Sequence, residues 1–285
     1  MEQKRQIFKC APLPFQGQKR HFVSEFARLL EAHNEKQEIR VVVDLFGGSG
    51  LLAHVAKRVL PNARVIFNDY DNYSVRLAAI GTTNEILGRL REIVAGTPKT
   101  LQLAAPTRAR VLKLVGEYDH RGYVDYITVS SNLLFPGKYA LDFEDLSKSG
   151  LYNRVRKSYY DIDAGDYLSG LEVRNTDYKE LFEEFKDTPG VIFLVDPPYL
   201  STDTKTYGSD KYWKLRDYLD VLKVLGGSRY VYFTSNKSSL PELGQWLGEN
   251  VGIGNPFDGA EIRTRSNSVN PLSGYEDMML YKLSA

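Results

Sequence analysis

The sequence VIFLVDPPYL, residues 191–200, ends an apolar run with a carboxylate, two prolines and a tyrosine. Proline has no N–H to give to a sheet ladder, so the strand predicted from the apolar residues ends at this point. These residue types suit an exocyclic amine on a planar base, which is a poor nucleophile because its lone pair is delocalised into the ring. Asp196 and the Pro197 carbonyl, stiffened by Pro198, could each accept an amine hydrogen and aim the lone pair at an electrophilic methyl group. Tyr199 could stack on the base, a contact worth about 1–3 kcal/mol.

A second acid, Asp44, lies near the end of the β-branched run 39–46 and precedes the glycine turn Gly47–Gly50. An acid at the end of a strand, followed by a Gly-rich turn, lets a nucleotide-like ligand approach the backbone closely. The third spaced glycine of the dinucleotide fingerprint is missing, because Leu51 and Leu52 follow the turn. The motif therefore favours a smaller adenosine ligand over a pyrophosphate. The structural alternative is a glycine turn needed only to pack a helix on a strand.

A third acidic motif, NDYD, ends the next apolar run, and Asp69 is its better-placed acid. An acid about 20 residues after the glycine turn commonly accepts hydrogen bonds from ribose hydroxyls. The alternative is a helix N-cap formed by Asp69 or Asp71.

Apolar periodicity predicts an α/β framework that positions these motifs. Strands are predicted over residues 39–46, 63–69, 171–178 (a strand and its turn), 191–195 and 229–236. Helices are predicted over residues 21–32, 51–60, 212–225 and 242–247, with one more that starts at about residue 74 and another that ends at residue 185. Strand, glycine turn, helix and strand form a βαβ unit, which predicts a doubly wound, mostly parallel sheet. Residues 260–266 and 276–283 could pair as a C-terminal β-hairpin. Ligands bind at the carboxyl ends of such strands, which disfavours a purely structural turn at Asp196.

The middle of the chain interrupts this rhythm. About 145 residues separate Gly50 from Asp196, more than one or two βα units can fill. We therefore predict an inserted subdomain over residues 89–165, with residues 1–88 and 166–285 forming the main α/β domain.

The composition is that of an ordinary globular protein, with 42% hydrophobic and 26% charged residues and a net charge of +1. No apolar run has the length of a membrane span or of a signal peptide. A single cysteine, Cys10, excludes an intrachain disulfide framework and fits a reducing cytosol. Four scattered histidines make no metal-ligand pattern. We expect a cytoplasmic protein without a metal, working as a monomer or weak dimer.

Three motifs in this order, PFQGQK (14–19), DLFGGSG (44–50) and DPPY (196–199), resemble the Dam-like class of DNA adenine N6-methyltransferases. The resemblance spans nearly the whole chain, including a long insert before DPPY. It implies a Rossmann-like methyltransferase sheet that uses S-adenosylmethionine (SAM) and needs no metal. The implied substrate is double-stranded DNA, with the target adenine rotated out of the stack.

The resemblance also implies roles for individual residues. Catalysis is expected from Asp196, Pro197, Pro198 and Tyr199. The expected SAM site comprises Phe15, Lys19, Asp44, Phe46, Gly47, Ser49, Gly50, Asp69, Asp177 and Tyr178. In this set Phe15 and Lys19 line the methionine end, Asp69 holds the ribose, and Asp177 and Tyr178 meet the adenine. Residues 234–236, TSN, resemble a motif near the target-base pocket, while Leu45 and Gln18 depart from a frequent proline and glycine.

The insert is the expected target-recognition region. Residues 101–160 contain nine Lys or Arg and six Asp or Glu, an excess of three positive charges. Tyrosines flank Arg154, Arg156 and Lys157, which suits contacts to phosphates and to bases or sugars. Lys205 and Lys211 follow DPPY in a polar stretch that could close over a flipped base. For each of these residues the alternative is an ordinary solvated surface.

Two other functions remain open. Cytosine N4 methylation uses the same amine chemistry, and a non-catalytic module could keep SAM and DNA binding without turnover. RNA as the substrate is less favoured because the insert is so large. A nicotinamide dehydrogenase would share the βαβ unit, but the incomplete glycine fingerprint and the DPPY tetrapeptide disfavour it.

Overall fold

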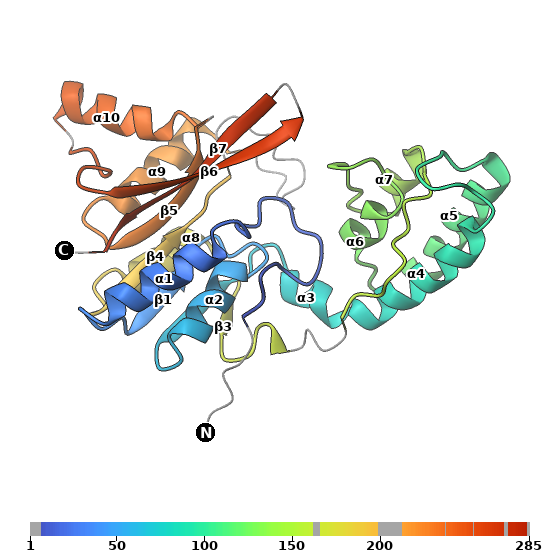
Figure 1. Cartoon of the computed structure of the whole chain (residues 1–285), viewed down its shortest axis with the longest axis horizontal. Helices are drawn as coiled ribbons and strands as arrows, with labels where there is room; N and C mark the ends of the chain where they lie inside the picture. Colours follow the sequence, from blue (N-terminus) through green and yellow to red (C-terminus); the bar gives the residue numbers. More distant parts are fainter. Residues whose placement is uncertain are drawn as a thin grey trace. The chain divides into compact units, whose positions relative to one another are not determined.

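The computed structural model describes residues 7–161, 166–198, 213–236, 238–252, 254–270 and 273–283. The chain forms two compact units (Figure 1). The sheet unit comprises Met1–Cys10, Gln18–Asp71 and Gly170–Ala285, and the helical unit comprises Ala11–Gly17 and Asn72–Ser169.

The sheet unit contains seven strands in the described part of the chain: β1 Val41–Asp44, β2 Arg64–Asn68, β3 Glu172–Arg174, β4 Val191–Val195, β5 Tyr230–Ser235, β6 Glu261–Asn270 and β7 Ser273–Lys282. Its helices are α1 Val23–Asn34, α2 Leu51–Val59, α8 Tyr178–Phe185, α9 Leu215–Leu225 and α10 Leu240–Val251. The strand order is β3-β2-β1-β4-β5-β7-β6. Strands β1 to β5 pair in parallel, whereas β7 is antiparallel to β5 and forms a hairpin with β6.

This strand order confirms the predicted doubly wound α/β sheet and its C-terminal hairpin. The chain runs outward from β1 to β3, returns to β4 beside β1, and then runs outward on the other side. The order reverses between β1 and β4, and open α/β sheets bind their ligands at such a switch point.

Helices cover both faces of the sheet, which explains the uninterrupted apolar strands of the sequence. On one face, Val43 and Phe193 belong to a core that includes residues of α8 and α9. On the other face, the α1 ring of Phe26 and the preceding Phe22 meet Phe233 of β5 edge-on, with ring centroids 6.2 and 5.7 Å away. Figure 1 shows α1 and α2 in blue in front of the strands. Only residues near the strand ends are therefore free to meet a ligand.

The helical unit contains α3 Tyr73–Ala78, α4 Ile80–Val94, α5 Ala105–Asp119, α6 Tyr126–Ser131 and α7 Phe143–Lys148. Its bounds differ from the predicted insert 89–165, because it begins at Asn72 and includes residues 11–17. The reason is packing: Ile86, Leu87 and Leu90 of α4 are fully buried, and α4 lies against α5.

The segment Tyr126–Ser131 is helical, although its β-branched residues gave no helical pattern in the sequence. Asp125 caps this helix by accepting a hydrogen bond from the Thr128 backbone N–H at 3.1 Å. Capping and burial therefore override the local propensity.

None of the helices described is both long and apolar enough to cross a membrane. The described residues also include no group of three or more His, Cys, Asp or Glu side chains that could hold a metal ion.

Candidate active site

The sheet register brings three acids to neighbouring strand ends. Asp44, the last residue of β1, pairs with Phe67 of β2 on one side and with Leu194 of β4 on the other. Asp69 and Asp196 each follow two residues beyond these partners. The sheet therefore places all three predicted acids at the edge where the strand order reverses.

Asp196 forms a nearly buried ion pair with Lys19. The Lys19 Nζ atom lies 2.5 Å from the Asp196 Oδ2 atom, and the side chains are 8% and 16% exposed. Burial raises the pKa of Asp196, the positive charge of Lys19 counteracts this increase, and Asp277 adds to it. The family resemblance implied that Lys19 lines the methionine end of the cofactor, and the structure adds this direct contact with the proposed catalytic carboxylate.

The rest of the tetrapeptide is partly described. Pro197 is buried and Pro198 is half-buried directly after β4. Tyr199, Lys205 and Lys211 lie outside the described residues.

The carboxyl group of Asp44 is buried at the end of β1. Its side chain is 1% exposed, and neither oxygen has a partner of hydrogen-bonding geometry within the described structure. Burial raises the pKa of Asp44 to about 8, and the nearby charge of Asp196 contributes. The backbone amides of Ala53 and Phe46 offset part of the increase without forming hydrogen bonds of normal geometry. Such a group is costly unless a ligand satisfies it.

The glycine turn has two separate physical requirements. A Cβ atom at Gly47 would lie 2.3 Å from the Phe67 ring and 2.8 Å from the Asn68 carbonyl oxygen. Gly48 and Gly50 instead have positive φ angles of 50° and 72°, and Gly50 is the N-cap of helix α2. Gly47 is therefore required for close packing, as in the alternative in which the glycine turn serves only to pack a helix on a strand. Gly48 and Gly50 are required for the backbone path, which places the buried Ser49 between them.

Asn68 joins two of the predicted ligand-binding segments, and sequence reasoning missed it. Its side-chain amide donates to the carbonyls of Leu45 and Thr176, both at 3.0 Å, and its oxygen accepts from the Thr176 N–H at 3.1 Å. The side chain of Asn175 donates to the Asp69 carbonyl at 3.0 Å. The only signal in the sequence was the position of an asparagine next to Asp69 at a strand end.

Three aromatic rings gather beside the glycine turn. Phe46 lies 4.7 Å from Tyr178, and Trp213 stacks on Tyr178 at 5.9 Å with an interplanar angle of 20°. Trp213 lies two residues before α9. In the sequence it belonged to the predicted helix 212–225, and nothing there indicated its contact with Tyr178. Asp177 is exposed and N-caps α8 by accepting from the Lys179 N–H at 2.8 Å.

The predicted target-base segment at the end of β5 is tied to the hairpin. Thr234 is fully buried, and its hydroxyl has no partner in the part of the chain described. Asn236 donates its backbone N–H to the Glu276 carbonyl at 2.9 Å and accepts from the Glu276 N–H with its side chain at 3.1 Å.

The helical unit contains the other predicted residues. Phe15 meets Tyr73 edge-on at 5.9 Å. The guanidinium of Arg156 lies over the Tyr160 ring at 3.9 Å and donates to the Ser158 hydroxyl at 2.9 Å. Lys157 is exposed and Arg154 is half-exposed.

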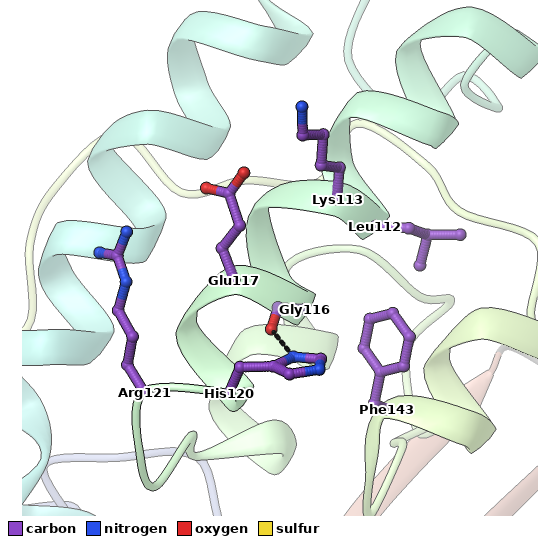
Figure 2. A pocket seen from close by; sticks show the side chains of 7 residues that line it. All are labelled: Leu112, Lys113, Gly116, Glu117, His120, Arg121 and Phe143. Atoms are coloured by element: carbon purple, nitrogen blue, oxygen red, sulfur yellow. Dashed lines mark hydrogen bonds between the residues drawn. The ribbon is translucent and has the colours of Figure 1, made fainter.

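An open hollow of about 510 Å³ lies between α5 and α7 in the helical unit (Figure 2). It is lined by Leu112, Lys113, Gly116, Glu117, His120, Arg121 and Phe143. His120 Nδ1 lies 2.6 Å from the Gly116 carbonyl, which assigns the ring proton to Nδ1 in the neutral form. The three basic side chains were not predicted as ligand-binding residues, because helical spacing alone does not distinguish them from a solvated face.

Comparison with known proteins identifies the family. The model for the D12 class of N6 adenine-specific DNA methyltransferases matches residues 15–106. A Haemophilus influenzae protein, assigned provisionally as a methyltransferase, is 34% identical over 285 residues, covering 98% of this chain and 94% of the relative. This chain belongs to the D12 methyltransferase family. The resemblance drawn from the three sequence motifs is thus confirmed.

A solved structure, the precorrin-6y C5,15-methyltransferase of Geobacter metallireducens, aligns with 97% of the D12 methyltransferase and 100% of its own chain. The TM-score is 0.40 and the identity is 8%. A likeness this weak adds nothing to the fold, which the strand order establishes by itself.

The unpaired carboxyl of Asp44 predicts how the stability of the D12 methyltransferase depends on pH. Its pKa of about 8 is raised, so between about pH 4 and 8 the folded state binds more protons than the unfolded state. The free energy of unfolding should therefore fall as pH rises, by about 1 kcal/mol per pH unit from this group. Asp44→Asn should remove that part of the slope in urea titrations at pH 5, 6 and 7. Asp187→Asn, at an exposed position before β4, should leave the slope unchanged, and parallel curves for wild type and Asp44→Asn would contradict the assignment.

Gly47→Ala is expected to destabilise the D12 methyltransferase by about 3 kcal/mol or more, because the added methyl overlaps a buried ring and a carbonyl. Gly81→Ala is the matched control, since nothing lies within 4 Å of the Cβ position in α4. It should be neutral or stabilising by about 0.5–1 kcal/mol. Urea unfolding monitored by circular dichroism measures both. Equal stability of the two variants would show that the turn can move to accept a side chain.

Proposed function

We propose that this D12 methyltransferase transfers a methyl group from SAM to the N6 amine of an adenine in double-stranded DNA. The observation that carries the proposal is the pair of buried carboxyl groups, Asp44 and Asp196, at the switch point of the sheet. Asp196 pairs with Lys19, whereas Asp44 has no hydrogen-bond partner among the described residues, so the two can serve different ligands.

The residues at the switch point fit SAM. Asp44 offers an unpaired carboxyl to the ammonium group of the methionine moiety, and the turn 47–50 lets the ligand approach the backbone. Phe46 and Tyr178 present aromatic rings for an adenine, and Asp69 lies where a ribose hydroxyl could donate to it. SAM would supply the electrophilic methyl group.

Asp196 and the Pro197 carbonyl would hold the target amine. Each accepts one amine hydrogen, which turns the nitrogen lone pair out of the ring plane. Lys19 favours the charged form of Asp196 despite burial, so the carboxylate stays an acceptor. The nitrogen becomes acidic as its new bond forms, so it can lose its proton afterwards and Asp196 need not act as a full base. Positioning of this kind can supply much of the rate acceleration.

The helical unit would bind the duplex. Arg154, Arg156 and Lys157 are proposed to contact phosphates, as are Lys205 and Lys211 from the segment after DPPY. The exposed cations Lys113 and Arg121 beside the hollow extend this candidate surface, and the His120 imidazole lies with them. Tyr199 would stack on the flipped adenine.

Lys157→Ala should weaken DNA binding with a reduced dependence on salt. Each lost phosphate contact lowers the slope of log K against log salt by about 0.9 for duplex DNA. Fluorescence anisotropy with a labelled duplex at several salt concentrations measures the slope. Lys36→Ala, an exposed lysine after α1, is the control and should leave it unchanged. Identical slopes for wild type and Lys157→Ala would remove Lys157 from the interface.

One assay tests the proposed function against its rivals. The protein is incubated with tritiated SAM and duplex DNA of mixed sequence, and the DNA is digested to nucleosides. Label in N6-methyladenine is expected. Label in N4-methylcytosine would select the cytosine reaction, and bound SAM without any transferred label would indicate a non-catalytic module.

A further inference from the structure

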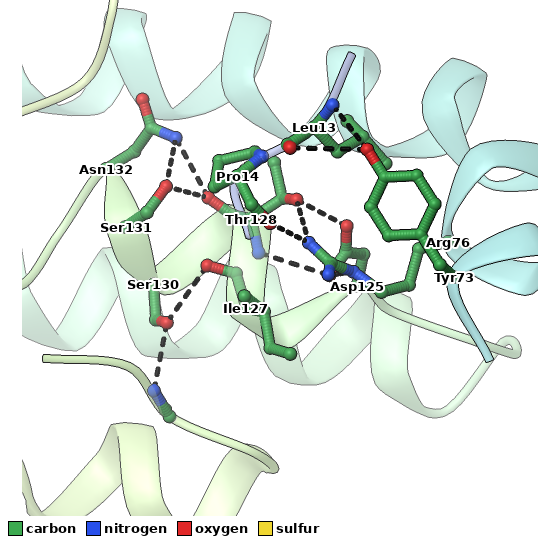
Figure 3. A network of polar contacts seen from close by, with 11 residues as sticks. Leu13, Pro14, Tyr73, Arg76, Asp125, Ile127, Thr128, Ser130, Ser131 and Asn132 are labelled. Atoms are coloured by element: carbon green, nitrogen blue, oxygen red, sulfur yellow. Dashed lines mark hydrogen bonds and ion pairs between the residues drawn. The ribbon is translucent and has the colours of Figure 1, made fainter. Parts of the chain in front are cut away.

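Two side chains of α3 clamp the N-terminal segment Leu13–Pro14 inside the helical unit (Figure 3). The first is Tyr73, which is fully buried. Its hydroxyl accepts a hydrogen bond from the Leu13 N–H at 2.9 Å and donates one to the Leu13 carbonyl at 3.2 Å. Both backbone groups of one residue outside regular secondary structure are thereby satisfied by a single side chain.

The second is Arg76, which is 3% exposed. It donates through Nη2 to the Pro14 carbonyl at 2.6 Å and to the Thr128 hydroxyl at 3.2 Å, and through Nε to Asp125 Oδ1 at 3.0 Å. Asp125 is 1% exposed and also caps helix α6. One buried network therefore joins α3, α6 and the N-terminal segment.

Stability alone is a weak reason for such a network. A buried ion pair often contributes no more than apolar residues of the same volume, because both charges must leave water. Directional hydrogen bonds also select the individual backbone groups that a side chain meets, which apolar contacts do not. The network specifies where the chain lies at Leu13 and Pro14, immediately before Phe15.

The path of the backbone at Leu13 and Pro14 affects two residues that follow, Phe15 and Lys19. Phe15 packs against Tyr73 and is a proposed cofactor contact. Lys19 follows four positions later and pairs with Asp196. Within the helical unit Tyr73 and Arg76 hold the chain just before Phe15, and within the sheet unit Asp196 holds Lys19.

We propose that Arg76 and Tyr73 are positioning residues for the methyl-transfer reaction, which hold the segment 13–19 for SAM binding and for the Lys19–Asp196 pair. This inference rests on the proposed function. Both contact the backbone of Leu13 and Pro14, and both would act through it.

The test uses the full chain with Tyr73→Phe, Arg76→Lys and a matched control, Asn84→Ala. Asn84 clamps Tyr160 in the same way within the same unit, donating to its carbonyl and accepting from its N–H, both at 2.8 Å. Three quantities are measured: hydrogen exchange of the peptide covering 11–19, the Kd for SAM by calorimetry without DNA, and the pH dependence of methyl transfer.

Tyr73→Phe and Arg76→Lys are expected to speed exchange in residues 11–19 and to raise the Kd for SAM about tenfold or more. They should also move the acid limb of the pH–rate profile upward, because Lys19 would then counteract the raised pKa of Asp196 less effectively. Asn84→Ala should lower the melting temperature while leaving the SAM Kd and the acid limb unchanged. Tyr73→Phe removes only a hydroxyl and keeps the buried ring. The test can therefore be completed with this variant if Arg76→Lys fails to fold.

Faster exchange with an unchanged SAM Kd would overturn the positioning role. So would equal effects of Asn84→Ala and Tyr73→Phe on the Kd, since these would indicate general loosening of the helical unit. Failure of the proposed function looks different, because wild-type protein would then show no methyl transfer or no SAM binding at all.

Discussion

Asp196→Ala is expected to lower kcat for methyl transfer about 10³-fold, while the Kd for SAM changes by no more than a few-fold. The carboxylate is the acceptor that turns the amine lone pair toward the methyl group, and alanine leaves one amine hydrogen without a partner. SAM binding should persist because its proposed contacts, among them Asp44 and Phe46, belong to a different strand end. Single-turnover transfer of tritium with saturating SAM measures the chemical step, and calorimetry measures the Kd.

Two further variants sharpen this result. Asp196→Asn keeps one oxygen acceptor but not the charge, so its rate should lie between those of the wild type and Asp196→Ala. Asp187→Ala removes an exposed carboxylate that precedes β4 and should have wild-type kinetics. Turnover that survives in Asp196→Ala would show that the carboxylate does not hold the amine.

Lys19→Met is expected to move the acid limb of the pH–rate profile upward by about one pH unit or more, and to slow turnover at neutral pH. Burial raises the pKa of Asp196, and the charge and hydrogen bond of Lys19 are the influences that lower it. Without Lys19 the pKa of Asp196 rises further, so the carboxyl becomes protonated at a higher pH and the acceptor is lost there. Rates measured from pH 5 to 9 under single-turnover conditions follow this shift.

The same substitution changes stability in a defined direction. Removing one partner of a buried pair leaves an uncompensated charge, which typically costs about 3–5 kcal/mol. Because the pKa of the unpaired Asp196 is raised, this cost should be largest at high pH and should shrink as the pH falls through that pKa. Lys19→Arg keeps the charge and should restore most of the activity. A pH–rate profile of Lys19→Met that coincides with wild type would mean that the ion pair does not influence the reaction.

The alternation of apolar runs and helical periodicities predicted the α/β sheet, because strands covered on both faces must be continuously apolar and their helices amphipathic. The motifs DPPY and DLFGGSG could be placed at strand ends for the same reason, since proline and glycine end a ladder by their own covalent structure.

Other features could not be read from neighbouring residues. The segment Tyr126–Ser131 is a helix despite its β-branched residues, and the helical unit begins at Asn72 because α4 buries its apolar face against α5. Asn68 meets Thr176 because β2 pairs with β3. Trp213 meets Tyr178 because the chain before α9 lies beside the start of α8.

The sequence by itself therefore determined the fold class, the family and the identity of the acids at the strand ends. Only the tertiary structure decided that Lys19 pairs with Asp196, that Asp44 is buried without a hydrogen-bond partner among the described residues, and that Arg76 and Tyr73 hold the segment before Phe15. The physical reason is that these relations join residues far apart in the chain. Sheet register and side-chain direction set them, and no local propensity encodes either.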